Sequence, residues 1–293
     1  MWFFLALASA FFYSFRGIGE KRIISKVNTF ILGAAVRLFA LPFFVLPFFF
    51  RPQLALPLHH LDSTFWVVVA IVSLINTPLE AFCYYEALKR EEVTLVLPIL
   101  TLGPVLTVLF ASVFLHELPT FLGVAGVLFV VLGIYALKLS QAKEGLLEPL
   151  KVLHKNTAVR LMLVVVLSQG ISSLFDKVGV VHSNAYVYAL INYVGVSLVL
   201  VGIAIFKAFD QLKQFFTYAK YFFILGFIVA GYTLFYYVAL ETGFAGYVSA
   251  IKSASLLFTM LMGILFLKEK DGKQKILSGI LIVIGLILLK IFG

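Results

Sequence analysis

Tyr84-Tyr85-Glu86-Ala87-Leu88 returns in the second half of the chain as Tyr236-Tyr237-Val238-Ala239-Leu240. At the same separation, Phe114-Leu115-His116-Glu117 returns as Phe266-Leu267-Lys268-Glu269. A separation that stays constant through polar as well as apolar positions is difficult to obtain by chance among apolar segments. The sequence therefore predicts two homologous halves in tandem.

Two further matches extend the repeat. Gly133-Ile134-Tyr135-Ala136-Leu137-Lys138 corresponds to Gly285-Leu286-Ile287-Leu288-Leu289-Lys290, and Glu20-Lys21 corresponds to Asp176-Lys177 at a slightly different separation. The expected units are a first repeat at residues 1–140, a polar linker at 141–156 and a second repeat at 157–293.

The composition places the chain in a membrane. Hydrophobic residues make up 62% of the sequence and charged residues 13%, whereas a soluble domain carries about 25% charged residues. Such a chain cannot cover a water-facing surface with polar groups. The net charge of +9 could indicate a nucleic-acid partner, but the Lys and Arg residues lie in short loops between apolar runs. We therefore expect the lipid bilayer, and no nucleic acid, as a partner.

Apolar runs separated by polar breaks predict ten membrane-spanning helices, five in each half. The expected spans are 2–19, 29–50, 64–88, 93–115, 121–137, 159–181, 185–206, 219–240, 246–267 and 276–292. An odd number of spans per half makes the second copy enter the membrane in the opposite orientation. The predicted fold is all-α, with ten transmembrane helices in two inverted-topology five-helix repeats, and this architecture is typical of secondary transporters.

The paired pattern of Tyr-x-Ala-Leu, Leu-x-Glu and Gly, once per half, resembles the EamA-type family of the drug/metabolite transporter superfamily. Leu115-His116-Glu117 and Leu267-Lys268-Glu269 resemble that family's mark at the end of the fourth helix of each repeat, and Arg37 resembles an arginine of its second helix. Phe15-Arg16-Gly17 departs from the Trp-Gly pair that is usual in the first helix. The resemblance implies ten helices, alternating access and export of metabolites or drugs.

We therefore expect a secondary active transporter, and not an enzyme, that exports a small metabolite across the plasma (inner) membrane. The resemblance also implies coupling to an ion gradient. The protein is expected to act as a monomer or homodimer and without a cofactor. Transport or flipping of lipid-like or drug-like compounds is one alternative, and an intramembrane lipid-modifying enzyme is another. The enzyme needs a clustered acid/base or metal site, whereas the sequence offers only dispersed charges.

Nucleotide-binding and metal-binding motifs are missing from the sequence. It contains neither a Gly-x-x-x-x-Gly-Lys-Ser/Thr loop nor a His-Glu-x-x-His motif. We therefore expect no ATP hydrolysis by the chain, no metal site and no catalytic residue.

Four ionisable residues lie at membrane depth, where a charge costs several kcal/mol unless it is paired or faces water. By helical rise, Arg37 and Glu80 lie at similar depths toward one side, and Lys252 and Asp176 toward the other. They are candidates for binding substrate or for gating a central cavity. The alternative is that they form structural ion pairs or extend to the interface.

Uncharged polar residues in the predicted spans could line the same cavity. Tyr232 occupies the repeat position equivalent to Glu80, and Ser253 adjoins Lys252. Asn76 and Asn192 lie within the third and seventh spans. For any single polar side chain of this kind, packing between helices is the competing interpretation.

Basic residues predict the orientation of the chain. Numbered from the N-terminus, the odd loops hold most of the Lys and Arg residues, and the even loops hold little beyond Arg51. The positive-inside rule therefore places the odd loops in the cytoplasm and both termini outside. The family resemblance instead implies cytoplasmic termini for many relatives, and we follow the charges.

Cysteine labelling tests this orientation. In intact cells, a membrane-impermeant maleimide should react with a His59→Cys variant, which lies in an even loop. It should not react with Lys151→Cys in the central linker until the cells are permeabilised. The reverse pattern would show that the termini are cytoplasmic.

Overall fold

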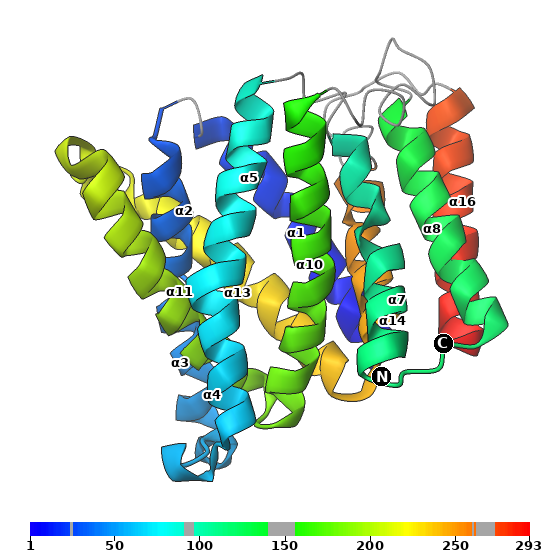
Figure 1. Ribbon diagram of the computed structural model, residues 1–293, viewed down its shortest axis with the longest axis horizontal. Coiled ribbons are helices and arrows are strands. Elements are labelled where there is room, and N and C mark those ends of the chain that lie inside the picture. The colour runs from blue at the N-terminus through cyan, green and yellow to red at the C-terminus, as the bar shows by residue number, and fades with distance from the viewer. Residues whose placement is uncertain (24–25, 91–96, 140–155, 260, 262–272) are drawn as a thin grey trace.

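The computed structural model describes residues 1–293 except 24–25, 91–96, 140–155, 260 and 262–272. The described residues form a bundle of helices that run up and down alongside one another (Figure 1). The predicted linker, apart from Asn156, lies outside the described residues, as do the end of the ninth predicted span and Glu269.

The first half contains helices close to the five predicted spans. Its elements are α1 (Trp2–Ile23), α2 (Thr29–Leu38) with α3 (Leu41–Phe50), α4 (Ser63–Ala70) with η3 (Ile71–Asn76) and α5 (Thr77–Arg90), η4 (Leu97–Leu102) with α7 (Gly103–Phe114), and α8 (Phe121–Leu139). Two short turns, η1 (Pro52–Leu54) and η2 (Leu58–His60), connect α3 to α4.

The second half repeats this order. Its elements are α10 (Thr157–Val181), α11 (Ala185–Ala208), η5 (Phe209–Gln211) with α12 (Gln214–Thr217), α13 (Ala219–Thr242), α14 (Ala245–Ser253) and α16 (Lys273–Phe292). The corresponding helices α2 and α11 both begin with an asparagine N-cap. Asn28 before α2 and Asn184 before α11 each accept hydrogen bonds from backbone N–H groups of the first helical turn, which would otherwise lack partners.

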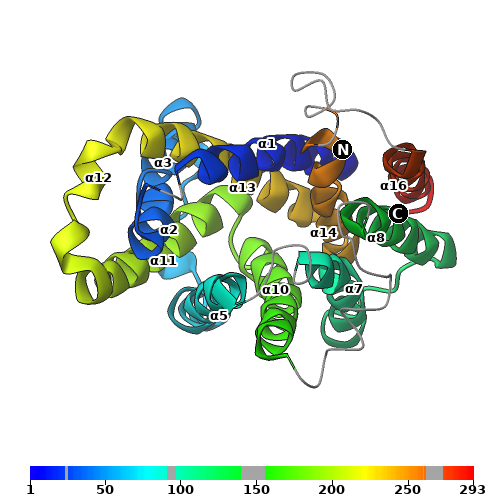
Figure 2. The same cartoon turned by 90° about the horizontal axis from the view of Figure 1, so that it is seen from above.

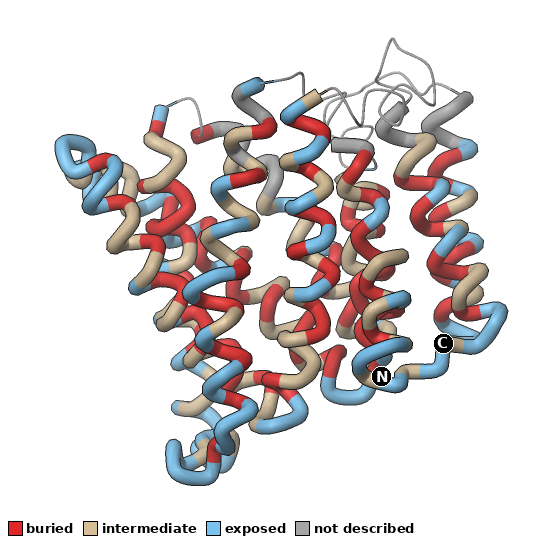
Figure 3. The backbone as a smooth tube through the Cα atoms, viewed as in Figure 1, coloured by how far each residue is buried: buried red, intermediate tan, exposed pale blue. Residues whose placement is uncertain are grey.

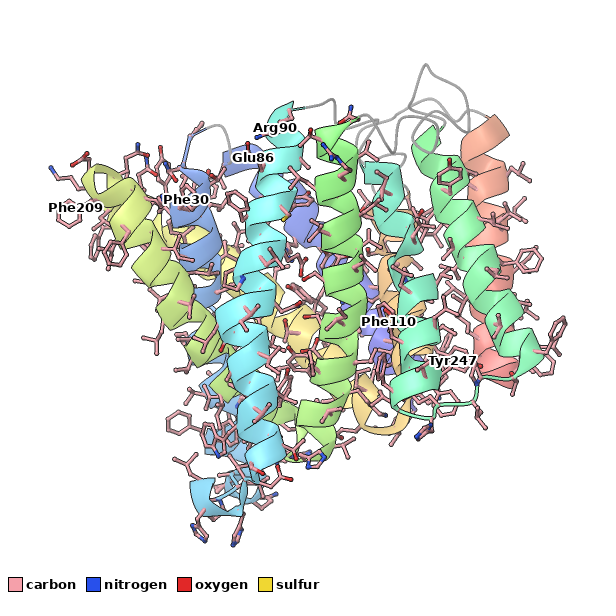
Figure 4. All side chains as sticks on the ribbon, viewed as in Figure 1. Phe30, Glu86, Arg90, Phe110, Phe209 and Tyr247 are labelled. Carbon is pink, nitrogen blue, oxygen red and sulfur yellow. The ribbon has the colours of Figure 1, made fainter. Side chains whose placement is uncertain are left out.

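Five of the described helices are each long and apolar enough to cross a membrane. They are Thr29–Phe50, Ser63–Tyr84, Thr157–Val181, Ala185–Gln211 and Ala219–Thr242, and four shorter apolar helices accompany them. Large apolar side chains such as Phe49 and Phe206 remain exposed, at 79% and 87%. Exposed positions follow the outer sides of the helices, and apolar side chains project outward from them (Figures 3 and 4). The outer surface is therefore suited to lipid, and the protein is a multi-pass membrane protein.

The packing of the helices shows the inverted repeat directly. Helix α1 packs against α13 of the other half, and its counterpart α10 packs in the same way against α5 (Figure 2). The second, fourth and fifth spans each pack against their own counterparts, in the pairs α2 with α11, α7 with α14 and α8 with α16. Exchanging the two halves leaves this set of neighbours unchanged. The prediction of an all-helical membrane fold in two inverted five-helix repeats is confirmed.

Both termini lie at one end of the bundle (Figure 1), together with the connection between α7 and α8. We call this end the terminal face. At the opposite end, the exposed pair of Glu86 and Arg90, 2.8 Å apart, lies on the last turn of α5 (Figure 4). An exposed pair of this kind contributes little stability.

Helices α8 and α16 approach closely through glycines. A Cβ atom added at Gly285 would lie 2.6 Å from the carbonyl oxygen of Gly126 and 2.7 Å from the backbone nitrogen of Val130. Neither backbone atom can move aside as a flexible side chain can. A Cβ atom added at Gly202 on α11 would meet no atom within 4 Å.

Substitution of these glycines tests the packing of α8 against α16. Gly285→Ala should lower the free energy of unfolding by about 1–3 kcal/mol, because the helices must separate to admit the methyl group. Gly202→Ala, a matched control in another helix, should be neutral or stabilising because alanine favours the helix. Thermal unfolding in detergent measures both, and equal effects would contradict the close contact.

Candidate functional site

Asp176 of α10 lies where three helices of the second half meet. Its Oδ1 atom accepts hydrogen bonds from the hydroxyl groups of Tyr188 of α11 (2.9 Å) and Tyr237 of α13 (3.2 Å). Asn192 of α11 donates to the Tyr237 oxygen over 3.3 Å. The side chains of Tyr188, Tyr237 and Asn192 are buried. Two phenols thus hold the carboxyl group of Asp176, and no Lys or Arg lies within ion-pair distance of it among the described residues.

Lys252 of α14 has an aromatic neighbour in place of the expected carboxylate. Its Nζ atom lies 4.0 Å from the centre of the Tyr236 ring. The carboxyl groups of Asp176 and Glu80 lie beyond ion-pair distance of it. The structural ion pair between Lys252 and Asp176 that was considered from depth is therefore not formed.

Arg16 of α1 is an interior cation that sequence reasoning left out of the site. Its Nε atom lies 2.8 Å from Glu20 Oε1, and its Nη1 atom donates to the Tyr232 hydroxyl over 3.1 Å. The guanidinium also lies near the rings of Tyr13 and Tyr232, at 5.5 and 5.8 Å. The four-residue spacing of Arg16 and Glu20, which places them on one helix face, was the signal that could have identified this pair.

Glu80 and Asn76 bind α10 across the interface between α5 and α10. Gln169 donates to Glu80 Oε1 over 3.1 Å. Asn76 donates to Ser172 Oγ over 2.8 Å and accepts from Ser168 Oγ over 2.7 Å. Asn76 ends the π-helical turn η3, an element that often occurs at functional positions and that was not predicted. These bonds attach the middle of the third span to the sixth.

Two further candidates, Arg37 and Ser253, bond to carbonyl groups of their own helices. Arg37 donates to the Gly33 carbonyl over 3.0 Å, and Ser253 donates to the Ser249 carbonyl over 3.0 Å. Arg37 and Glu80, expected at similar depths, do not form an ion pair among the described residues. Tyr188, Tyr236 and Tyr237 were not among the predicted site residues. Tyr236 and Tyr237 entered the sequence analysis only as part of the repeat, and the sequence does not show what their hydroxyl groups or rings contact.

The interior therefore contains two charged side chains, Asp176 and Lys252, whose contacts with neutral groups can be replaced by other contacts. Asp176 is held by neutral hydroxyl groups and Lys252 by a ring; within the described part of the chain, neither forms a close ion pair. A polar or charged solute could replace these neutral contacts without breaking a salt bridge. Among the described residues, no group of three or more His, Cys, Asp or Glu side chains could hold a metal ion.

Comparisons with known proteins concern the family and the fold of the chain. The model of the EamA-like transporter family matches residues 1–139 and 156–291. An uncharacterised protein of Methanocaldococcus jannaschii is 33% identical over 137 residues, which are 46% of this chain and 98% of that protein. That relative is therefore about as long as one half of the chain. A solved crystal structure superposes with a TM-score of 0.74, covering 98% of this chain and 95% of the other at 16% identity, and shares the fold.

Removal of a single hydroxyl group tests the support of Asp176. Tyr188→Phe should lower the free energy of unfolding by about 1–3 kcal/mol, because a buried carboxyl group loses a donor. Tyr186→Phe, on the same helix, is the matched control: its hydroxyl makes no hydrogen bond to the described residues, so its effect should stay within about 0.5 kcal/mol. Thermal unfolding in detergent compares the two variants, and a Tyr188→Phe variant as stable as the control would contradict the role given to this hydroxyl.

Proposed function

The chain belongs to the EamA-like transporter family, and on this premise we propose that it is a secondary active exporter of a small polar or amphipathic metabolite. It moves the solute across the plasma membrane by alternating access, and an ion gradient drives the movement. The two inverted repeats supply the two alternative arrangements that alternating access requires.

The observation that carries this proposal is the environment of Lys252. A lysine inside a membrane bundle costs several kcal/mol unless something compensates its charge. A desolvated contact between an ammonium group and an aromatic ring contributes about 2 kcal/mol. The Tyr236 ring, 4.0 Å away, offsets part of that cost, and no carboxylate of the described residues lies within ion-pair distance to offset the rest. An anionic group on the solute is a partner that fits this lysine.

Asp176 gives the same region a second, opposite charge. Its two phenol donors, Tyr188 and Tyr237, stabilise the carboxylate without neutralising it. A solute with both an acidic and a polar or basic group could contact Lys252 and Asp176 together. Binding of candidate compounds to detergent-solubilised protein distinguishes such a metabolite from the lipid-like or drug-like alternative.

Transport by variants of Lys252 tests the proposal. After a solute has been found with wild-type proteoliposomes, Lys252→Met should reduce its transport on the order of 100-fold, because a charge-assisted contact is worth about 1.5–3 kcal/mol. The variant should still insert and unfold at a similar temperature. Combining it with Asp176→Asn should not restore transport, because the solute, and not Asp176, is the partner that Lys252 requires.

The double variant separates the two roles of Lys252. If Lys252→Met with Asp176→Asn transports normally, the lysine only balances the charge of Asp176 within the bundle. That result would remove Lys252 from the binding site even though the fold and the family stand.

A further inference from the structure

Glu117 joins the two repeats at the terminal face. It lies in the connection between α7 and α8, outside the membrane-spanning helices. Its Oε2 atom accepts a hydrogen bond over 2.8 Å from the backbone nitrogen of Ala245, the first residue of α14. Its Oε1 atom lies 3.9 Å from Nζ of Lys177 on α10, and its side chain is only 10% exposed. One carboxyl group of the first half therefore contacts two helices of the second.

Lys177 has other partners besides Glu117. Its Nζ atom donates to the carbonyl oxygens of Leu240 and Gly243 at the end of α13. Carbonyl groups at a helix C-terminus lack partners within the helix and attract a cation. Lys177 would therefore keep its position if Glu117 lost its charge.

A small cavity adjoins the Glu117 carboxyl group. It encloses about 10 Å³ and is lined by Val108, Ala111, Ser112, Glu117, Pro119, Phe244, Gly246 and Tyr247. This volume is close to that needed by a single water molecule. Neither Glu117 Oε1 nor the Tyr247 hydroxyl oxygen has a hydrogen-bond partner among the described residues, although both are buried. Most of the lining residues are apolar, so the inner carboxyl oxygen faces a pocket that disfavours a charge on it.

The surroundings favour the protonated form of this carboxyl group. Burial raises the pKa of Glu117 above its ordinary value, and the Ala245 N–H and the Lys177 ammonium oppose this shift only in part. The titratable and charged groups around Glu117 among the described residues are Lys177 from α10, Tyr236 from α13 and Tyr247 from α14, with the exposed His116 next to it in the chain.

We propose that Glu117 binds and releases a proton during the transport cycle. The Oε1 atom holds the proton while the terminal face is sealed, that is, while water from that side cannot reach the carboxyl group. When that face opens, water reaches the carboxyl group, the O–H bond breaks, and the proton leaves to the aqueous phase on that side. The coupling of this step to solute movement rests on the proposed transport function, whereas the linkage between the proton and the seal does not.

The direction of the pH effect follows from linkage. A carboxyl group whose pKa is higher in the sealed state than in the hydrated, open state binds its proton more tightly when sealed. Acid therefore stabilises the sealed face, and alkali, by ionising Glu117, favours opening. A static lock made by the charged pair of Glu117 and Lys177 has the opposite sign, because protonation would then weaken the seal.

Alkylation of a cysteine in the cavity measures the seal without any solute. In a Cys83→Ala background, Ser112→Cys is treated with N-ethylmaleimide between roughly pH 5 and pH 8, a range above the ordinary Glu pKa. Each rate is divided by that of the unfolded protein at the same pH, which removes the ionisation of the thiol. The corrected rate should rise with pH, by at most about tenfold per pH unit for one linked proton.

Two variants test whether the ionisation of Glu117 causes the pH dependence of the alkylation rate. Glu117→Gln keeps an oxygen for the Ala245 N–H but cannot ionise, so its corrected rate should stay low at every pH. Glu241→Gln is the matched control, since Glu241 also accepts a backbone N–H at this face, from Ala185 at the start of α11, but is exposed. It should keep the wild-type profile. A raised rate in Glu117→Gln, a wild-type slope in that variant, or a wild-type rate independent of pH would each overturn the proposal.

Transport assays separate this inference from the proposed function. If wild-type proteoliposomes move a solute, Glu117→Gln should retain solute exchange in the absence of a pH gradient and lose accumulation driven by one. If no solute is moved by the wild type, the function proposed above fails, while the alkylation profiles still decide whether Glu117 links a proton to the seal.

Discussion

The hydrocarbon core of a bilayer contains no water to solvate a charge or to bond a peptide group, so every polar group there needs a partner within the protein or its solute. The backbone meets this requirement by forming helices. The side chains meet it mostly across helices: Asp176 through two phenols, Glu80 through Gln169, and Arg16 through Tyr232 as well as through Glu20 of its own helix. Lys252, with only a ring beside it, is the described interior charge that this requirement leaves least satisfied.

The two halves place different side chains at equivalent positions, so corresponding contacts in the two halves differ in chemistry. Glu20 and Asp176 correspond in the repeat, yet Glu20 pairs with Arg16 and Asp176 accepts from tyrosines. Tyr232 corresponds to Glu80: Tyr232 packs on Tyr13 at 5.0 Å between α1 and α13, and Glu80 bonds to Gln169 between α10 and α5. Equivalent contacts thus persist while their chemistry changes. This asymmetry gives the two halves of the bundle different polar contacts.

The terminal face and the interior use charge in different ways. The interior charges Lys252 and Asp176 are separated and have neutral neighbours, which suits exchange with a solute. At the terminal face, Glu117 and Lys177 lie 3.9 Å apart and are tied to helix ends by backbone hydrogen bonds. A change in the charge of Glu117 therefore acts on the relation between the two repeats, because the described partners of its carboxyl group, Ala245 and Lys177, belong to the second half.

The sequence alone determined the helical spans and the inverted repeat. Apolar runs of about 20 residues specify a spanning helix through their own composition, and residues 29–50, 185–206 and 219–240 were predicted almost to the residue. The sequence did not determine the partners of the interior polar groups. The contact of Lys252 with Tyr236, the phenol pair around Asp176 and the bond of Arg16 to Tyr232 depend on the rotation of each helix about its axis and on its depth. Packing between side chains of distant helices sets both of these, so only the tertiary structure decided which of the described charges have a close ion-pair partner and which do not.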